Sequence, residues 1–298
     1  MKTRADDFSG LTVAMITPFK GDKIDFDALE EQIEFQIAAG TTALSPVGTT
    51  GESPTLTHEE HRAVIEKTVR FVAGRAKVLA GAGSNSTAEA LSLARFAEKA
   101  GADALLVVGP YYNKPTQEGM YQHFKAVAEA VGVPICVYNV PGRTGRAIDV
   151  DTIVRLAEFK NIAMVKDATG SMESTSGIVA RTDLTVLSGD DGLTLPFMAL
   201  GARGVVSVVG NFAPRDLVAL CAAMNAGKLD EARALHQKLL PLSQGILSLS
   251  TNPIPVKKAM QLLGRDSGEM RLPMTELAPE PTAKLRQMLI DYGLNPVA

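Results

Sequence analysis

The sequence is poor in several residue types, and each shortage limits what the chain can be. Tryptophan is absent, aromatic residues make up 5% of the chain, and the two cysteines are Cys136 and Cys221. Two distant cysteines without a CxxC pattern indicate neither a disulfide framework nor a thiolate metal site. Cys136 lies in the apolar run Pro134–Tyr138, where we expect a small buried hydrophobic side chain rather than a reactive thiol.

Charge and hydropathy exclude further classes of protein. The formal net charge is −3, and the 30 Lys and Arg residues are scattered without a run of like charge. The chain therefore offers no basic field for nucleic acid or for an anionic membrane surface. No apolar stretch approaches the roughly 18 residues of a membrane span, and the N-terminal residues include no apolar signal segment. We expect a cytoplasmic globular protein that binds neither nucleic acid nor membrane.

Short apolar runs recur along the chain and alternate with amphipathic helical patterns. Each run is nearly continuously hydrophobic, as expected of strands that are buried on both faces of a parallel sheet. The predicted strands are Leu11–Phe19, Ala43–Gly48, Lys77–Gly83, Ala104–Pro110, Pro134–Val140, Ile162–Thr169, Leu184–Asp190 and Gly204–Val209.

Helical patterns fill the intervals between these runs. Two helices are expected to begin with a capping box, Thr57-x-x-Glu60 and Ser86-x-x-Glu89. Eight strands that are each followed by a helix predict an α/β protein with the (β/α)₈ TIM-barrel fold. An open doubly wound sheet is the alternative, but such sheets usually carry a Gly-rich turn after the first strand, which Thr17-Pro18-Phe19 does not supply. Examples of the helical patterns are Asp25–Ala39, Thr57–Val72 and Ser86–Lys99.

The pattern changes after the eighth strand, because only helical segments follow. We predict a catalytic barrel over residues 1–228 and a C-terminal helical appendage over residues 229–298, which packs on the barrel because no low-complexity linker separates the two. Prolines at positions 241, 253, 255, 273 and 279 are expected to break the appendage into separate helices. The predicted C-terminal helices are Leu217–Ala226, Asp230–Leu249, Ile254–Leu263 and Pro281–Tyr292.

Lys166 is the most informative polar residue, because it follows Ile162–Val165 within a predicted buried strand. Active sites of TIM barrels lie at the C-terminal ends of the strands. Burial disfavours a charged ammonium group and favours the neutral amine, which attacks carbonyl carbons. A structural lysine paired with Asp167 or Glu173 explains the position equally well.

Other polar side chains follow the neighbouring strands. A phenol at Tyr138 beside a reactive lysine could relay protons with the hydroxyls of Thr49 and Thr50, although taken alone Tyr138 is more typical of a core or rim aromatic. Arg143, after a Pro-Gly turn, is suited to holding a carboxylate through two hydrogen bonds, or it is a solvated loop residue. No cluster of His and carboxylate residues at the strand ends has the spacing of a metal site.

Four ordered motifs resemble the dihydrodipicolinate synthase family, and the similarity extends over essentially the whole chain. They are Gly48-Thr49-Thr50-Gly51-Glu52-Ser53, the segment Pro110–Gly119, Tyr138-Asn139-Val140-Pro141-x-Arg143-Thr144-Gly145 and Lys166-Asp167-Ala168-Thr169-Gly170; Asn252–Lys257 also agrees with the family. The resemblance implies a Schiff-base lyase that condenses pyruvate with L-aspartate-4-semialdehyde to 4-hydroxy-tetrahydrodipicolinate in lysine and diaminopimelate biosynthesis.

The resemblance also implies roles for individual residues. Lys166 would form a covalent imine with pyruvate, with no separate cofactor and no metal. Tyr138, Thr50 and Tyr112 would relay protons, with Tyr112 inserted from a neighbouring subunit. The substrate-binding residues would be Thr49, Thr50, Arg143, Gly189 and Val206, with Arg143 on the carboxylate of the semialdehyde. The family further implies a homo-oligomer, usually a tetramer built as a dimer of dimers.

A second group of residues matches the lysine-binding allosteric site of lysine-sensitive members. The resemblance therefore implies feedback inhibition by L-lysine, with Glu89 able to hold a cationic amine. Without the family match, a solvated helix with two incidental histidines would be the better interpretation. The matching residues are Ser53, His58, His61, Asn85, Glu89 and Tyr111.

Three alternatives to this function are weighed against the residues. Another pyruvate-dependent class I aldolase of the same superfamily, acting on a sugar acid or keto acid, shares the lysine. The N-acetylneuraminate lyases, a sibling family, however usually lack the paired threonines and the Pro-x-Arg-Thr-Gly arginine. A barrel that only binds a keto acid would be expected to lose Lys166, Tyr138 or Arg143, and all three are present. A phosphosugar aldolase would need a Gly-rich phosphate site after the last strands, where Asp190 and Asp191 place two carboxylates instead.

Overall fold

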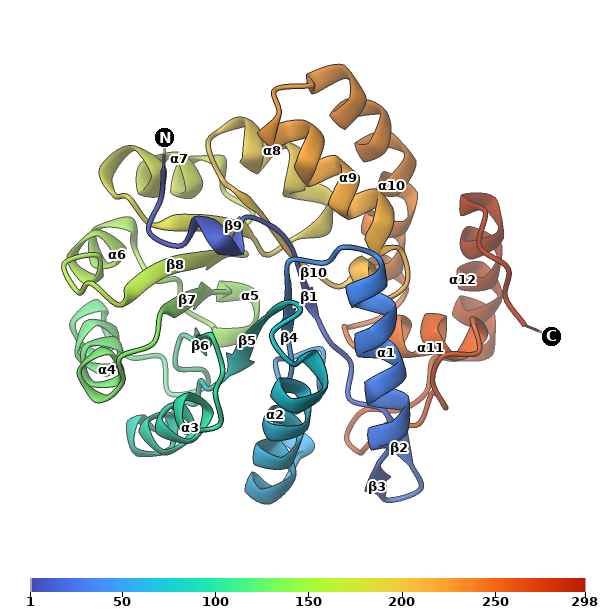
Figure 1. Ribbon diagram of the computed structural model, residues 1–298, viewed down its shortest axis with the longest axis horizontal. Coiled ribbons are helices and arrows are strands. Elements are labelled where there is room, and N and C mark those ends of the chain that lie inside the picture. Colours follow the sequence, from blue (N-terminus) through green and yellow to red (C-terminus); the bar gives the residue numbers. More distant parts are fainter. Residues whose placement is uncertain (1, 298) are drawn as a thin grey trace.

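Eight parallel strands close into a barrel in the computed structural model, which describes residues 2–297 (Figure 1). The strand order around the barrel is β1-β10-β9-β8-β7-β6-β5-β4, so neighbours along the chain are neighbours in the barrel. The TIM-barrel prediction is therefore confirmed, and the doubly wound alternative is wrong. The barrel strands are β1 (Gly10–Ala14), β4 (Ala43–Ser45), β5 (Lys77–Gly81), β6 (Ala104–Val108), β7 (Ile135–Asn139), β8 (Ile162–Asp167), β9 (Thr185–Ser188) and β10 (Gly204–Ser207).

All eight predicted strands exist, and each ends earlier than its apolar run. β1 begins at Gly10, one residue before the run from Leu11, and ends at Ala14; the run continues out of the barrel to Phe19. Residues from Phe19 form a small antiparallel hairpin of β2 (Phe19–Lys20) and β3 (Lys23–Ile24). β4 ends at Ser45, directly before Pro46, which lacks the amide hydrogen needed to continue the ladder. The residues left over at the strand ends become the loops over the mouth of the barrel.

Helices surround the barrel, as Figure 1 shows for α1 to α4 and α6 to α9. Thr57 forms the predicted capping box with Glu60 at the start of α2. At α3, Ser86 accepts from the Glu89 amide, but the Glu89 carboxylate turns to His58 and Ser84 instead of completing the box. The helices are α1 (Phe26–Ala38), α2 (His58–Val72), α3 (Thr87–Lys99), α4 (Gln117–Ala130), α5 (Pro141–Thr144), α6 (Val150–Leu156), α7 (Met172–Arg181), α8 (Thr194–Ala199), α9 (Pro214–Asn225), α10 (Leu229–Leu249), α11 (Ile254–Leu262) and α12 (Pro279–Tyr292), with 3-10 turns η1 (Asp6–Phe8), η2 (Ser53–Thr55), η3 (Asp191–Leu193) and η4 (Val209–Asn211).

Two apolar clusters form the core, one outside and one inside the barrel. The outer cluster fills the layer between strands and helices, with residues such as Val137, Val165 and Val186. The inner cluster fills the barrel and includes Tyr138 and Val206. Adjacent residues of one strand fall into different clusters because successive side chains point to opposite faces of a strand. None of the helices in the described chain is long and apolar enough to cross a bilayer.

The C-terminal helices α10, α11 and α12 pack on one another and on α9 at one side of the barrel, coloured orange to red in Figure 1. Pro241 does not break α10, contrary to expectation: the helix continues through it to Leu249. Leu239, Leu242 and Ile246 are buried on either side of the proline, and their packing offsets the lost backbone hydrogen bond. The predicted boundary between residues 228 and 229 falls between α9 and α10, and the division into two units stays a prediction.

A fully buried ion pair connects this C-terminal region to the turn after β4. Lys257 Nζ of α11 lies 2.7 Å from Glu52 Oε1, and their side chains are 0% and 1% exposed. The ammonium group also donates to the Glu269 carbonyl at 2.6 Å and lies 4.1 Å from the centre of the Phe19 ring. Burial lowers the pKa of Lys257, and the Glu52 carboxylate acts against that shift. Each charge therefore depends on the other for its place in the interior.

Removal of one partner of this pair tests its contribution to stability. Lys257→Met leaves the Glu52 carboxylate buried without its cation, so we expect the free energy of unfolding to fall by about 3–5 kcal/mol. The double variant Glu52→Gln/Lys257→Met removes both charges, and we expect it to recover most of this loss in urea titrations. Lys284→Met, in an exposed pair with Glu280, serves as the control and should change stability little. A double variant as unstable as Lys257→Met would show that the pairing of charges is not the cause.

Candidate active site

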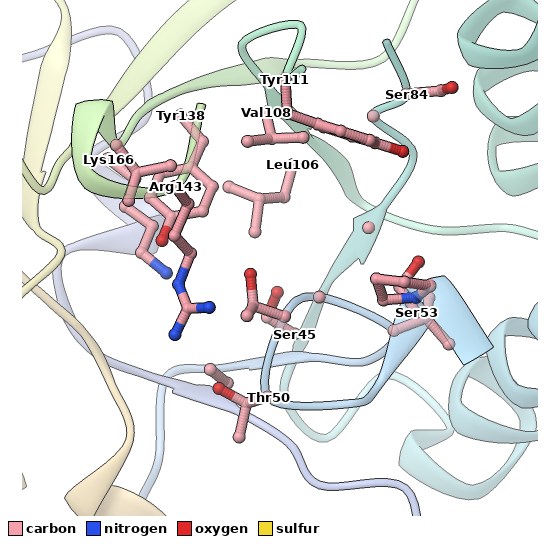
Figure 2. A pocket seen from close by; sticks show the side chains of 18 of the residues that line it. Ser45, Thr50, Ser53, Ser84, Leu106, Val108, Tyr111, Tyr138, Arg143 and Lys166 are labelled. Carbon is pink, nitrogen blue, oxygen red and sulfur yellow. The ribbon is translucent and has the colours of Figure 1, made fainter. Parts of the chain in front are cut away.

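A cavity of about 540 Å³ opens at the C-terminal end of the barrel (Figure 2). Each of the eight strands, or the loop directly after it, contributes at least one residue to its wall, as expected of an active site in this fold. Residues of the C-terminal region also reach it, namely Leu247 and Asn252. The strand-end residues, in chain order, are Ala14, Ser45, Gly81, Val108, Tyr138, Lys166, Gly189 and Val208.

Lys166 points into this cavity from the penultimate position of β8 and is 6% exposed. The expected alternative of an ion pair with Asp167 or Glu173 is wrong for the described chain. Asp167, the next residue in the strand, faces the opposite side and accepts hydrogen bonds from Thr169 and Thr175. Glu173 is exposed on α7. The lysine amine is thus held in the cavity without a carboxylate partner among residues 2–297.

Tyr138 lies beside Lys166 because the two residues are register partners on β7 and β8. Lys166 Nζ lies 4.1 Å from the centre of the Tyr138 ring, where the face of the ring stabilises positive charge. In Figure 2 the two side chains and Arg143 gather at one side of the cavity. No hydrogen bond joins the Tyr138 hydroxyl to Thr50 or Lys166 within the described residues. The phenol ring and the amine therefore lie side by side, and no hydrogen bond within the described residues joins them.

The Thr49-Thr50 turn after β4 is held in a constrained conformation. Val47 and Glu52, which flank it, adopt left-handed backbone angles of φ 49° and φ 55°, which are costly for side chains of this kind. Gly81 allows the turn to approach, since a Cβ atom there would lie 2.4 Å from the Val47 carbonyl oxygen. Both threonines line the cavity.

Asn252 connects this turn to Arg143. Its Nδ2 donates to Thr50 Oγ1 at 2.9 Å, and its backbone carbonyl accepts from Arg143 Nη2 at 3.1 Å. Arg143 projects from the short helix α5 at the exposed mouth of the cavity. We did not single out Asn252 from the sequence, because its partner Thr50 is 202 residues away and no local pattern links the two.

Gly189 lines the cavity as expected, but Val206 does not. Val206 is buried in the barrel interior, whereas Val208, two residues further along, reaches the cavity wall. Val208 follows the last residue of β10, Ser207. The expected contact of the Val206 backbone with pyruvate stays a prediction.

The two carboxylates after β9 do not face the cavity, contrary to expectation. Asp190 accepts from the Gly192 amide, and Asp191 is buried, with its carboxylate accepting from Ser207 Oγ and from the Val208 and Val209 amides. Burial raises the pKa of Asp191, and these hydrogen bonds oppose the shift. The Asp191 carboxylate accepts hydrogen bonds from the backbone amides that would bind a phosphate in this fold. This competition, rather than charge repulsion, argues against a phosphate site after β10.

The same cavity extends to a second group of polar residues around His58, His61 and Glu89. His58 Nε2 lies 2.7 Å from Glu89 Oε1, and the other Glu89 oxygen accepts from Ser84 Oγ. His61 bridges Ser53 Oγ at 3.3 Å and the Gly81 carbonyl at 2.9 Å, and burial lowers its pKa. Figure 2 shows Ser53 and Ser84 on the side of the cavity opposite Lys166, with Leu106 and Val108 between.

Two further predicted site residues, Tyr112 and Asn85, are not part of the cavity wall. Tyr112 is 89% exposed with φ 70°, so its side chain extends away from its own barrel. Asn85 lies near the second group, but its carbonyl accepts from Asn113 Nδ2 at 2.9 Å and it does not line the cavity. Tyr111 does line it. The described residues contain no group of three or more His, Cys, Asp or Glu side chains that could hold a metal ion.

The fold and this site define the class of the protein: a (β/α)₈-barrel enzyme with a lysine held in its cavity at a strand end. A family model described as the dihydrodipicolinate synthetase family matches residues 7–291. The 4-hydroxy-tetrahydrodipicolinate synthases of Syntrophus aciditrophicus and Methanocaldococcus jannaschii are 49% and 50% identical, each over 96% of this chain and 99% of theirs. The crystal structure of dihydrodipicolinate synthase from Aquifex aeolicus has 51% identity and a TM-score of 0.96, covering 98% of this chain and 100% of that chain. The chain belongs to the dihydrodipicolinate synthetase family, and it is a lyase.

Solved relatives with bound small molecules share this fold. The dihydrodipicolinate synthase of Acinetobacter baumannii, described as chloride-inhibited and complexed with pyruvate, is 44% identical with a TM-score of 0.94 over 96% of this chain and 99% of that chain. The enzyme of Cyanidioschyzon merolae with lysine bound is 39% identical with a TM-score of 0.94 over 97% and 99%. A dihydrodipicolinate synthase variant described as monomeric is 41% identical with the same TM-score over 97% and 98%.

Proposed function

We propose that this enzyme condenses pyruvate with L-aspartate-4-semialdehyde to 4-hydroxy-tetrahydrodipicolinate, in the cytoplasmic route to diaminopimelate and lysine. The observation that carries the proposal is the Lys166 amine, held beside Tyr138 in the barrel cavity without a carboxylate partner among the described residues. The curated relatives of this name, about half identical over nearly the whole chain, support the choice of reaction.

The chemistry proceeds through a covalent imine on Lys166. The neutral amine attacks the keto carbon of pyruvate, and loss of water leaves an iminium ion that acidifies the methyl group. A proton leaves the methyl carbon, and the resulting enamine attacks the aldehyde carbon of the second substrate to form the new carbon–carbon bond. The amino group of that substrate then attacks the imine carbon, so that ring closure displaces the Lys166 amine and regenerates it.

Neighbouring residues supply the proton transfers and the binding contacts. Tyr138 and Thr50 pass protons at the keto oxygen and the methyl carbon, and Tyr112 of a second copy completes the relay. Thr49 and Thr50 donate hydrogen bonds to the pyruvate carboxylate, with the backbone of Gly189 behind it. Arg143 at the mouth holds the carboxylate of the semialdehyde through two hydrogen bonds, for which its planar guanidinium is suited.

Reductive trapping tests the covalent step. Incubation with pyruvate and borohydride is expected to attach a 1-carboxyethyl group to Lys166, located by peptide mass spectrometry. Lys166→Arg keeps the charge but cannot form the imine, so it should give neither the adduct nor activity in a coupled assay with the semialdehyde. An adduct on another lysine would refute the mechanism. An adduct without turnover of the semialdehyde would instead point to a sister aldolase of the superfamily.

We further propose that the active enzyme is a homo-oligomer, a tetramer assembled from dimers in which Tyr112 enters the partner's cavity. The Tyr112 side chain is 89% exposed, and its backbone adopts a left-handed conformation; this exposure supports a role outside its own barrel. The relative described as monomeric makes the oligomeric state a question for experiment.

The Tyr112 hydroxyl is expected to matter for catalysis and not for the fold. Tyr112→Phe should lower kcat by about 10²- to 10⁴-fold, the range typical of a lost proton-transfer group. Its melting temperature and its sedimentation profile should match those of the unaltered chain. A protein that sediments as a monomer and keeps full activity in the coupled assay would contradict the shared site.

Finally, we propose that L-lysine inhibits the enzyme at the second group of residues. The Glu89 carboxylate, which lies near His58 and Ser84, suits an ammonium group, and the buried ring of His61 forms a neutral wall. The relative described as having lysine bound supports the choice of ligand.

Initial rates with and without millimolar L-lysine test the regulatory proposal. We expect inhibition that is weakened at least tenfold by Glu89→Gln, because the charge that pairs with the amine is lost. Glu59→Gln, an exposed position on the first turn of α2, provides a matched control and should keep the inhibition. Unchanged rates of the unaltered enzyme in lysine would refute the proposal without affecting the catalytic one.

A further inference from the structure

Asn252 occupies a position that the proposed reaction does not explain. It lies between α10 and α11, is 8% exposed and lines the cavity. Its side-chain amide contacts the Thr50 hydroxyl, and its backbone carbonyl contacts the Arg143 guanidinium. One residue of the C-terminal region thus touches groups proposed to bind each of the two substrates.

The hydrogen bond to Thr50 has a defined direction. A threonine hydroxyl has one proton to donate and two lone pairs, whereas the nitrogen of an amide group can only donate. Because Asn252 Nδ2 donates to Thr50 Oγ1 at 2.9 Å, the Thr50 proton must point elsewhere. No other described residue accepts it, so the Thr50 hydroxyl can donate to a ligand in the cavity.

The other atoms of Asn252 argue against a purely structural role. Its Oδ1 atom is buried and accepts no hydrogen bond from the described residues. An unsatisfied buried acceptor is costly, and an apolar side chain that only packed at this position would avoid that cost. Five residues further along, the buried Lys257–Glu52 pair anchors the same segment to the same turn, and thereby fixes Asn252 relative to Thr50.

We propose that Asn252 is a positioning residue, which keeps the Thr50 hydroxyl oriented as a hydrogen-bond donor to the carboxylate of the keto acid. Its carbonyl also holds the Arg143 guanidinium at the mouth. This inference rests on the proposed function, because it assigns the ligand of Thr50 as a carboxylate. It makes the C-terminal region part of the substrate-binding apparatus.

The variant Asn252→Asp tests the direction of this hydrogen bond, because it preserves shape while replacing the donor with an acceptor. An ionised carboxylate takes the Thr50 proton, so the pyruvate KM should rise tenfold or more at pH 8, with a smaller effect on kcat. As the pH falls and the introduced carboxyl becomes protonated, it can donate again. At each pH the pyruvate KM of the variant is divided by that of the unaltered enzyme. This ratio should fall toward one as the pH falls.

A double-mutant cycle with Thr50→Val assigns the effect to Thr50. In the valine background Asn252→Asp should raise the pyruvate KM much less, because no hydroxyl remains to be reoriented. Asn161→Asp is the matched control: Asn161 Nδ2 donates to the Ala128 and Val131 carbonyls next to the start of β8, away from the cavity. It should lower the melting temperature and leave the pyruvate KM unchanged.

Three outcomes would overturn the inference. A pyruvate KM unchanged by Asn252→Asp would mean that Thr50 donates to the amide oxygen of Asn252. A loss that is the same at every pH and tracks the melting temperature would show a structural role. An equal loss in the Thr50→Val background would show that the effect does not pass through Thr50. Borohydride trapping of pyruvate by the unaltered enzyme, run in parallel, separates these results from failure of the proposed function.

Discussion

Closure of the sheet into a barrel is the constraint on which the site depends. In a closed barrel every strand has one face toward the interior, so successive residues must alternate between the interior and the helical layer. This alternation sends Lys166 into the cavity and Asp167 into the outer layer, where Thr169 and Thr175 hold its carboxylate. It separates an amine from the acidic residue beside it in the chain, and so leaves that amine available for chemistry.

The C-terminal helices add a second constraint at the mouth of the barrel. The turn after β4 is strained at Val47 and Glu52, and such a conformation persists only where surrounding contacts hold it. Lys257 and Asn252 supply those contacts through a buried ion pair and a hydrogen bond. The groups that hold this backbone in place therefore also contact the turn whose threonines line the cavity.

The same cavity that contains Lys166 reaches the Glu89 carboxylate, although the two lie on different sides of it. The sequence pattern predicts that Glu89 caps the start of α3, but in the structure its carboxylate contacts His58 and Ser84 instead. A ligand bound there would contact residues from α2, α3 and the ends of β5 and β6. These elements also carry Gly81, against which the turn at Val47 packs, so the two ends of the cavity share a wall.

Much of the architecture was predictable because it rests on local patterns. The eight apolar runs, the Thr57 capping box and the helical C-terminal region all follow from periodicity and from short-range hydrogen bonding. The predictions failed where tertiary contacts override a local pattern: packing accommodates Pro241 within α10, and the Asp191 carboxylate accepts from backbone amides instead of facing the cavity. The polar strand ends of the sequence identified Lys166, Tyr138, Thr50 and Arg143 as candidates.

The sequence by itself determined which segments become strands and helices, since those choices depend on residues within a few positions of one another. Only the tertiary structure decided that Asn252 meets Thr50 across 202 residues and that Lys257 meets Glu52. It also decided that Lys166 has no acidic partner in the cavity among residues 2–297. Contacts of this range have no local signature, because they arise when the barrel closes and the C-terminal helices pack against it. The position of Lys166 in the cavity, buried beside Tyr138, also results from these long-range contacts.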